Sequence, residues 1–110
     1  MRRIVLALAI SVSGIGLAHA LDKEQLRAQA LLKEFCSRCH AVGTSGKSPH
    51  PYAPPFRNLG ENKLYDEEFS QRLQNGLSSI HPDMPTFHFS QNDAGAVIDY
   101  LRAIQAASRR

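Results

Sequence analysis

The stretch Cys36-Ser37-Arg38-Cys39-His40 decides how the rest of the chain is interpreted. A C-x-x-C-H motif is the covalent attachment signature of c-type haem. Its spacing has a chemical reason, because two thiols three residues apart on one turn of chain both reach the vinyl groups of one porphyrin. The histidine that follows is then held against the iron and supplies an axial imidazole. The motif therefore predicts one haem c, bound through Cys36 and Cys39 and ligated by His40.

Other interpretations of the two cysteines are weaker. A zinc site needs two further ligands, and the chain contains no third cysteine. His50, His81 and His88 are available, but none shows the H-x3–5-H spacing of a Cys2His2 site. A thioredoxin-like redox pair is expected beside a βαβ pattern, which this sequence lacks. A structural disulfide that spans only two intervening residues is unusual.

The N-terminal segment carries the pattern of an export signal. Arg2 and Arg3 form a positive region, residues 4–17 are mainly apolar, and Ala18-His19-Ala20 is a small-x-small cleavage site. The apolar run is shorter than the roughly 20 residues that a membrane-spanning helix needs. We therefore expect residues 1–20 to be a cleaved signal peptide and the protein to be periplasmic, on the side of the membrane where bacteria attach c-type haem.

Length and charge limit the function classes. The expected mature chain, residues 21–110, has the length of a single small domain. A domain of this size buries only about 60–65% of its unfolded surface, so a haem would supply missing apolar core. The chain has 13 Lys and Arg against 10 Asp and Glu, and loss of Arg2 and Arg3 with the signal leaves 11 against 10. No block of like charge stands out, so binding to nucleic acid has no support.

Hydrophobic periodicity predicts three helices, over residues 22–35, 66–75 and 90–106. The expected caps are Leu21 or Asp22, Asp66, and the variant capping box Ser90-Gln91-Asn92-Asp93, while Gly76 ends the second helix. The expected apolar faces are Ala28, Leu31, Leu32 and Phe35, then Phe69, Leu73 and Leu77, then Val97, Ile98, Leu101 and Ile104. With no repeats and no β-hairpin signals, the chain is expected to be all-α.

A proline-rich loop follows the motif. Residues 43–60 contain four prolines, so this chain is expected to be ordered but irregular. An imidazole that binds a metal usually donates its other N–H to an acceptor that fixes its orientation. We expect the carbonyl of Pro54 to be that acceptor for His40.

A second proline-rich stretch, residues 79–89, contains Met84. His81 and Met84 each precede a proline, which favours extended chain rather than helix. A methionine on such a loop is poorly placed for core packing and well placed to present its thioether. A Met/His axial pair is typical of cytochromes c and raises the reduction potential. We therefore predict Met84 as the sixth iron ligand, with His81 and His88 as alternatives.

These features together resemble the class I (mitochondrial-type) cytochromes c, in their small bacterial periplasmic monohaem form. The resemblance covers the mature chain and rests on the motif, on Ala53-Pro54-Pro55-Phe56 in place of the family's Gly-Pro-x-Leu, on Met84-Pro85, and on residues 97–101 of the last helix. It implies a cytochrome c fold of three to four helices, with long loops wrapped around one covalent haem. It also implies a tight crossing of the first and last helices, with Ala28 as the small residue and Leu32 opposite Tyr100.

The chain departs from the family pattern near the haem. The insertion Ser48-Pro49-His50-Pro51-Tyr52 leaves Pro55 as a second choice for the carbonyl that accepts from His40. No tryptophan is available for the haem propionates. Tyr52, Arg57 and Tyr65 are the polar residues that we expect near the propionates instead.

The expected function is one-electron transfer rather than enzyme catalysis. With His40 and Met84 both bound, the iron has no open position for a substrate. Redox partner proteins would dock transiently, through a small interface. The alternatives are an electron-accepting subunit of a periplasmic dehydrogenase or oxidase complex, a haem-based ligand sensor with a labile Met84 bond, and a small exported helical protein with a structural zinc.

Overall fold

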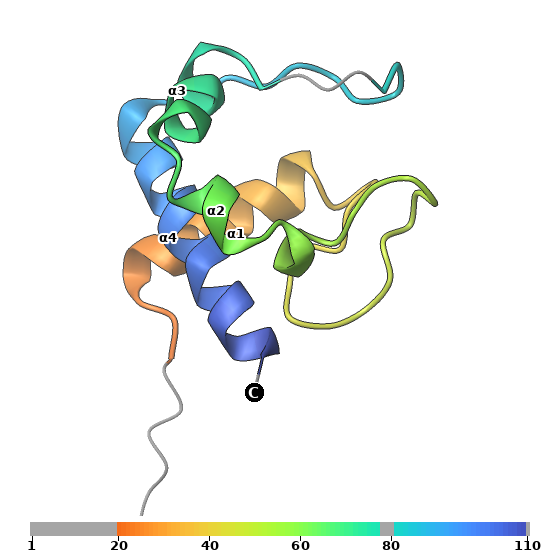
Figure 1. Cartoon of the computed structure of the whole chain (residues 1–110), viewed down its shortest axis with the longest axis horizontal. Coiled ribbons are helices and arrows are strands. Elements are labelled where there is room, and N and C mark those ends of the chain that lie inside the picture. Colours follow the sequence, from red (N-terminus) through yellow and green to blue (C-terminus); the bar gives the residue numbers. More distant parts are fainter. Residues whose placement is uncertain (1–19, 78–80, 110) are drawn as a thin grey trace, which may run out of the picture.

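A computed structural model describes residues 20–77 and 81–109 of the chain. Within these ranges the chain forms four α-helices and one 3-10 helix (Figure 1). They are α1 (Lys23–Phe35), η1 (Phe56–Asn58), α2 (Glu61–Leu64), α3 (Glu67–Asn75) and α4 (Gln91–Ser108). The described residues contain no strand, only an isolated bridge between Leu77 and Phe87. The all-α prediction is therefore confirmed, whereas the predicted signal peptide lies outside the described residues except for Ala20.

The helix ends follow from local side-chain chemistry. Asp22 caps α1 in a capping box, because its carboxylate accepts the N–H of Gln25 at 2.8 Å and the Gln25 side chain accepts the N–H of Asp22 at 3.1 Å. Asp66 caps α3 by accepting the N–H of Glu68 at 3.0 Å. Ser90 caps α4 by accepting the N–H of Asp93 at 3.1 Å. All three predicted helices thus start where their caps predict.

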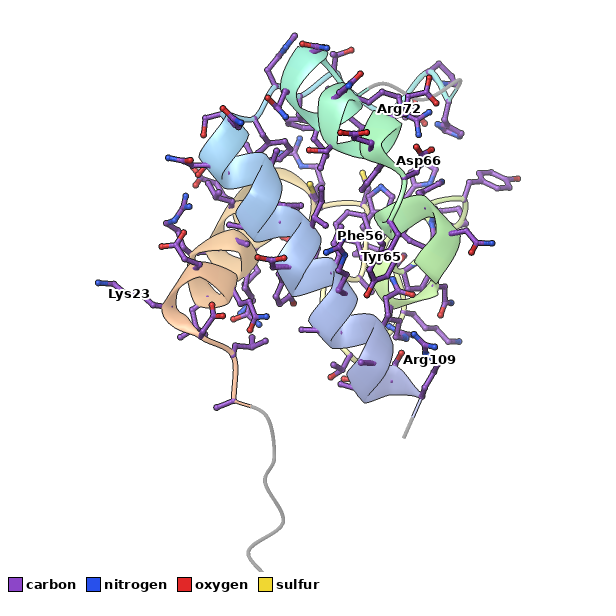
Figure 2. All side chains as sticks on the ribbon, turned by 60° about the vertical axis from the view of Figure 1, so that its left-hand side comes forward. Lys23, Phe56, Tyr65, Asp66, Arg72 and Arg109 are labelled. Carbon is purple, nitrogen blue, oxygen red and sulfur yellow. The ribbon has the colours of Figure 1, made fainter. Side chains whose placement is uncertain are left out.

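The core lies where α1 packs against α4. Figure 2 shows the two helices crossing. Ala28 of α1 and Val97 and Tyr100 of α4 are completely buried, and Leu32 is nearly so. These are the residues that the predicted tight crossing requires. The other buried apolar side chains are Val42, Leu64, Phe69, Leu73, Ala94, Ala96, Ile98, Leu101 and Ile104.

The helices differ from the sequence-based expectation in a few details. Phe35 was expected on the buried face of α1, but it is 45% exposed and its ring lies 5.9 Å from that of Phe87. Arg27, on the partly exposed side of α1, forms ion pairs with Glu24 on its own helix and with Asp93 of α4. The short elements η1 and α2 were not predicted, because a helix of three or four residues is too short to show a hydrophobic period.

Gly76 ends α3 as predicted, in a conformation with φ of +123°. The chain then turns back, because the N–H of Leu77 and the carbonyl of Phe87 bond at 2.9 Å and the N–H of Phe89 donates to the carbonyl of Leu73 at 2.8 Å. The loop that carries Met84 is therefore anchored to α3 at both of its ends. In Figure 1 the described part of this loop, residues 81–87, and the loop after α1 extend to the same side of the helices.

Side chains of α4 hold the chain from η1 to the end of α2. Gln105 is buried, and its amide donates to the carbonyl of Phe56 at 2.7 Å and accepts the N–H of Gly60 at 3.2 Å. Arg102 donates to the carbonyl of Leu64 at 2.9 Å and lies 4.0 Å over the ring of Tyr65. Figure 2 shows Phe56 and Tyr65 beside the middle of α4. None of the described helices is long and apolar enough to cross a membrane.

Candidate functional site

The C-x-x-C-H motif forms a single turn at the end of α1. Cys36 caps the helix by donating its N–H to the carbonyl of Leu32 at 2.8 Å. The carbonyl of Cys36 then accepts the N–H groups of both Cys39, at 3.2 Å, and His40, at 2.9 Å. The backbone of Cys36, Cys39 and His40 therefore lies on one turn, as the spacing predicts. Both cysteines are half-buried free thiols.

The Cys36 thiol is held in its protonated form. Burial, and secondarily the neighbouring Cys39, raises the pKa of Cys36 to about 11. Redox-active cysteine pairs of the thioredoxin type have the opposite property, because their function requires a thiol with a lowered pKa. The environment of Cys36 therefore argues against a redox-active cysteine pair.

The imidazole of His40 is oriented by the proline-rich loop. Its Nδ1 lies 2.8 Å from the carbonyl oxygen of Pro54. Because a carbonyl only accepts, Nδ1 carries the proton and Nε2 keeps its lone pair. The ring also lies 4.6 Å from the ring of Phe56, at an angle of 31°. The predicted acceptor, Pro54 rather than Pro55, is confirmed.

The chain on both sides of Pro54 is pinned by backbone hydrogen bonds. The N–H of His50 donates to the carbonyl of Cys39 at 3.1 Å, and the N–H of Phe56 donates to the carbonyl of Ala41 at 3.0 Å. Cys39 of the motif and Ala41, just after it, therefore hold the loop that orients the motif's histidine. This reciprocal arrangement keeps the Nε2 lone pair of His40 in a defined direction.

These residues fit a haem c by the chemistry of their donors. Two thiols and an imidazole with one free nitrogen lie on the same turn, which is the set that covalent attachment and proximal ligation require. Arg57 adds a further observation: its Nη2 donates to the carbonyl of Gly46 at 2.8 Å, but its buried Nη1 has no hydrogen-bond partner among the described residues. An unsatisfied guanidinium N–H suits a carboxylate such as a haem propionate.

Met84 and the two alternative sixth ligands, His81 and His88, lie on one loop but have different surroundings. Met84 is half-buried and closes a turn, its N–H donating to the carbonyl of His81 at 3.2 Å. His81 is turned toward the proline-rich loop, where its ring lies 5.0 Å from that of His50. His88 is exposed and lies against Gly76. Met84 as the sixth ligand stays a prediction.

The two tyrosines expected near the propionates are exposed. Tyr52 is 78% and Tyr65 is 66% exposed. The ring of Tyr52 lies 5.9 Å from that of His81, and the ring of Tyr65 faces Arg102. Their predicted role is not tested by these contacts.

One group of side chains was missed by the sequence analysis. His50, considered there only as a badly spaced zinc ligand beside the two cysteines, lies with its Nε2 3.3 Å from a carboxylate oxygen of Asp83. His81 belongs to the same group. The available signal was the recurrence of a His-Pro pair, at residues 50–51 and 81–82.

The chain is similar to known proteins over most of its length. A family model described as cytochrome c oxidase, cbb3-type, subunit III matches residues 23–101, which run from the start of α1 into α4 and include the motif. Cytochrome c-552 of Bradyrhizobium diazoefficiens is 27% identical over 105 residues, which cover 96% of this chain and 95% of that protein. No solved structure shows a significant match.

Proposed function

Because this chain belongs to the family of cytochrome c domains described as cytochrome c oxidase, cbb3-type, subunit III, and is a small class I c-type cytochrome, we propose that it is a periplasmic one-electron carrier. The function of the family is haem-based electron transfer. In this proposal Cys36 and Cys39 hold one haem c through two thioethers, and His40 and Met84 bind its iron. The signal peptide, residues 1–20, is removed on export.

The observation that supports this proposal most strongly is the hydrogen bond between His40 and Pro54. It leaves Nε2 of His40 as the one nitrogen able to bind iron, and it fixes the plane of the ring. A bound haem supplies the ferric–ferrous couple. The residues of the chain hold the ligands still, exclude water and set the potential, and the soft Met84 thioether favours the ferrous state.

A second protein ligand, Met84, would also separate a carrier from an enzyme. If both His40 and Met84 bind the iron, no position is left for a substrate, so the protein exchanges electrons with partners without transforming them. Docking with donors and acceptors would then be brief and bury a small surface.

The test is expression of the full chain, with its signal, in cells that mature c-type cytochromes. We expect a periplasmic protein that begins at Leu21, stains for haem on a denaturing gel and has a low-spin spectrum. Replacement of Cys36 and Cys39 together by alanine should abolish the stain. A haem that remains on the gel in the double variant would contradict covalent attachment through this motif.

A second candidate is a haem-bearing, electron-accepting subunit of a periplasmic oxidase or dehydrogenase complex. The description of the matching family, which names an oxidase subunit, favours it. The axial ligands and spectrum would be the same for a free carrier and a subunit. Purification from native membranes and periplasm distinguishes them, because a subunit migrates with a large complex in size-exclusion chromatography and a carrier migrates alone.

A further inference from the structure

The two proline-rich loops each contain a turn of the same kind, and the two turns face each other. They are His50-Pro51-Tyr52-Ala53 and His81-Pro82-Asp83-Met84. In each turn the N–H of the fourth residue donates to the carbonyl of the first, at 3.2 Å in both. Proline in the second position is favoured in such turns because its ring fixes the required φ. The two histidines are therefore held at the start of two ordered turns.

The turns also orient the histidine rings in the same way. In each one the N–H of the third residue donates to Nδ1 of the histidine, at 3.1 Å in the first turn and 3.3 Å in the second. The two rings meet edge to face, 5.0 Å apart at 85°. Two loops that are distant in sequence thus bring two imidazoles into direct contact.

The carboxylate of Asp83 completes the group. Its Oδ2 lies 3.3 Å from Nε2 of His50 and 4.0 Å from Nδ1 of His81. The three side chains offer three ligand atoms that all lie within 4.8 Å of one another. We name this group, His50, Asp83 and His81, the two-turn triad.

We propose that the two-turn triad is a binding site for a divalent transition-metal ion of the Zn²⁺ or Cu²⁺ type. Ligand bonds of about 2.0–2.2 Å at a tetrahedral ion place the ligand atoms about 3.3–3.6 Å apart. His50 and Asp83 already have that spacing, and the other pairs reach it with shifts of about 1 Å. Imidazole nitrogens favour these metals over Mg²⁺ and Ca²⁺, which take oxygen ligands.

The hydrogen bonds that the ion would replace at His50 have exposed partners, Tyr52 and Asp83. Nδ1 of His50 accepts the N–H of Tyr52, so the proton of the neutral ring sits on Nε2 and points at Asp83. An ion bound at Nε2 takes the place of that proton and leaves the Tyr52 N–H without its acceptor. Tyr52 is exposed, so water can accept this N–H instead.

The triad joins the two segments that flank the proposed haem. The N–H of His50 is bonded to the carbonyl of Cys39 in the haem motif, and Asp83 immediately precedes Met84. A bound ion would therefore tie the Met84 turn to the motif. The metal site itself does not depend on the haem, and only this coupling rests on the proposed function.

The test is calorimetric titration of the metal-stripped mature holoprotein with Zn²⁺. We expect one ion per chain. His50→Ala and His81→Ala should each lose at least about tenfold in affinity, because loss of a mere second-shell partner already costs about 10–100-fold. Asp83→Asn removes the carboxylate with little change in shape and should also weaken binding. His88→Ala is the matched control, since His88 lies on the same loop but outside the triad.

Several results would overturn the site. The first is that the natural chain shows no saturable binding of Zn²⁺. The second is that His50→Ala and His81→Ala bind Zn²⁺ as tightly as the natural chain. The third is that His88→Ala loses as much Zn²⁺ affinity as the triad variants. His50→Gln and His81→Asn keep polar side chains and guard against a misfolded alanine variant. The haem spectrum and the helical circular dichroism of every variant show that it is folded, so a failure of the metal site is separate from a failure of haem attachment.

Discussion

The hydroxyl of Tyr100 in α4 donates a 2.6 Å hydrogen bond to the carbonyl of Val42, two residues beyond His40. Tyr100 is completely buried, and Val42 belongs to the same core. The chain that leaves the haem motif is thus tied to the C-terminal helix at the centre of the protein. This contact makes the position of the motif depend on packing between the two ends of the domain.

Removal of this hydroxyl should destabilise the fold. Tyr100→Phe keeps the ring but leaves the buried Val42 carbonyl without its partner, which costs about 1–3 kcal/mol. Urea unfolding of the holoprotein measures the change in free energy. Tyr65→Phe is the control, because Tyr65 is exposed and should change stability by less than about 0.5 kcal/mol. Equal losses in the two variants would contradict a specific role for the Tyr100 bond.

The same tyrosine predicts a loss of stability at alkaline pH. Burial raises the pKa of Tyr100 above its ordinary value, against a smaller opposing effect of Gln29. Above about pH 10 the unfolded chain therefore loses this proton while the folded chain keeps it. Since the unfolded state then binds fewer protons, the free energy of unfolding falls as pH rises, by up to about 1.4 kcal/mol per unit.

Unfolding measured between neutral and strongly alkaline pH tests this linkage. The Tyr100→Phe variant lacks the titrating group and should show a shallower decline above pH 10 than the natural chain. Parallel curves for the two proteins would show that the alkaline loss comes from other groups.

Two glycines should respond in opposite ways to the same substitution. Gly76 has φ of +123°, and a Cβ there would lie 3.0 Å from Cε1 of His88 and 3.2 Å from Cγ2 of Thr86. Gly76→Ala should therefore destabilise by more than about 1 kcal/mol. Gly95 lies inside α4 with nothing within 4 Å of an added Cβ, so Gly95→Ala should stabilise by about 0.5–1 kcal/mol. Thermal unfolding of both variants measures the contrast, and the same sign in both would contradict it.

The predicted axial role of Met84 has a spectroscopic test. Met84→Ala should leave the haem attached, lower the reduction potential, remove the weak ferric iron–thioether charge-transfer band and open the ferrous iron to carbon monoxide. His81→Ala and His88→Ala are the controls, and both should keep the band. If the band and the exclusion of carbon monoxide survive in Met84→Ala, another side chain is the sixth ligand.

The sequence by itself determined the local features of this protein. The C-x-x-C-H spacing predicts the turn of Cys36, Cys39 and His40, and the caps at Asp22, Asp66 and Ser90 predict where the three longer helices begin. The end of α3 at Gly76 is predicted in the same way. These features depend on hydrogen bonds between residues only a few positions apart, so the order of residues is sufficient to predict them.

Only the tertiary structure decided which distant groups meet. The bond from His40 to Pro54 agrees with a chemical expectation. The sequence does not predict the bond from Tyr100 to Val42, and the repeated His-Pro pair does not by itself show that His50 meets Asp83. The partial exposure of Phe35 likewise depends on what packs around the end of α1. The packing of α1 on α4 determines which side chains meet across the fold. Backbone hydrogen bonds, such as the one from His50 to Cys39, determine the conformation of the loops. A periodic pattern in the sequence records burial within one element and carries no information on which other element supplies the contact.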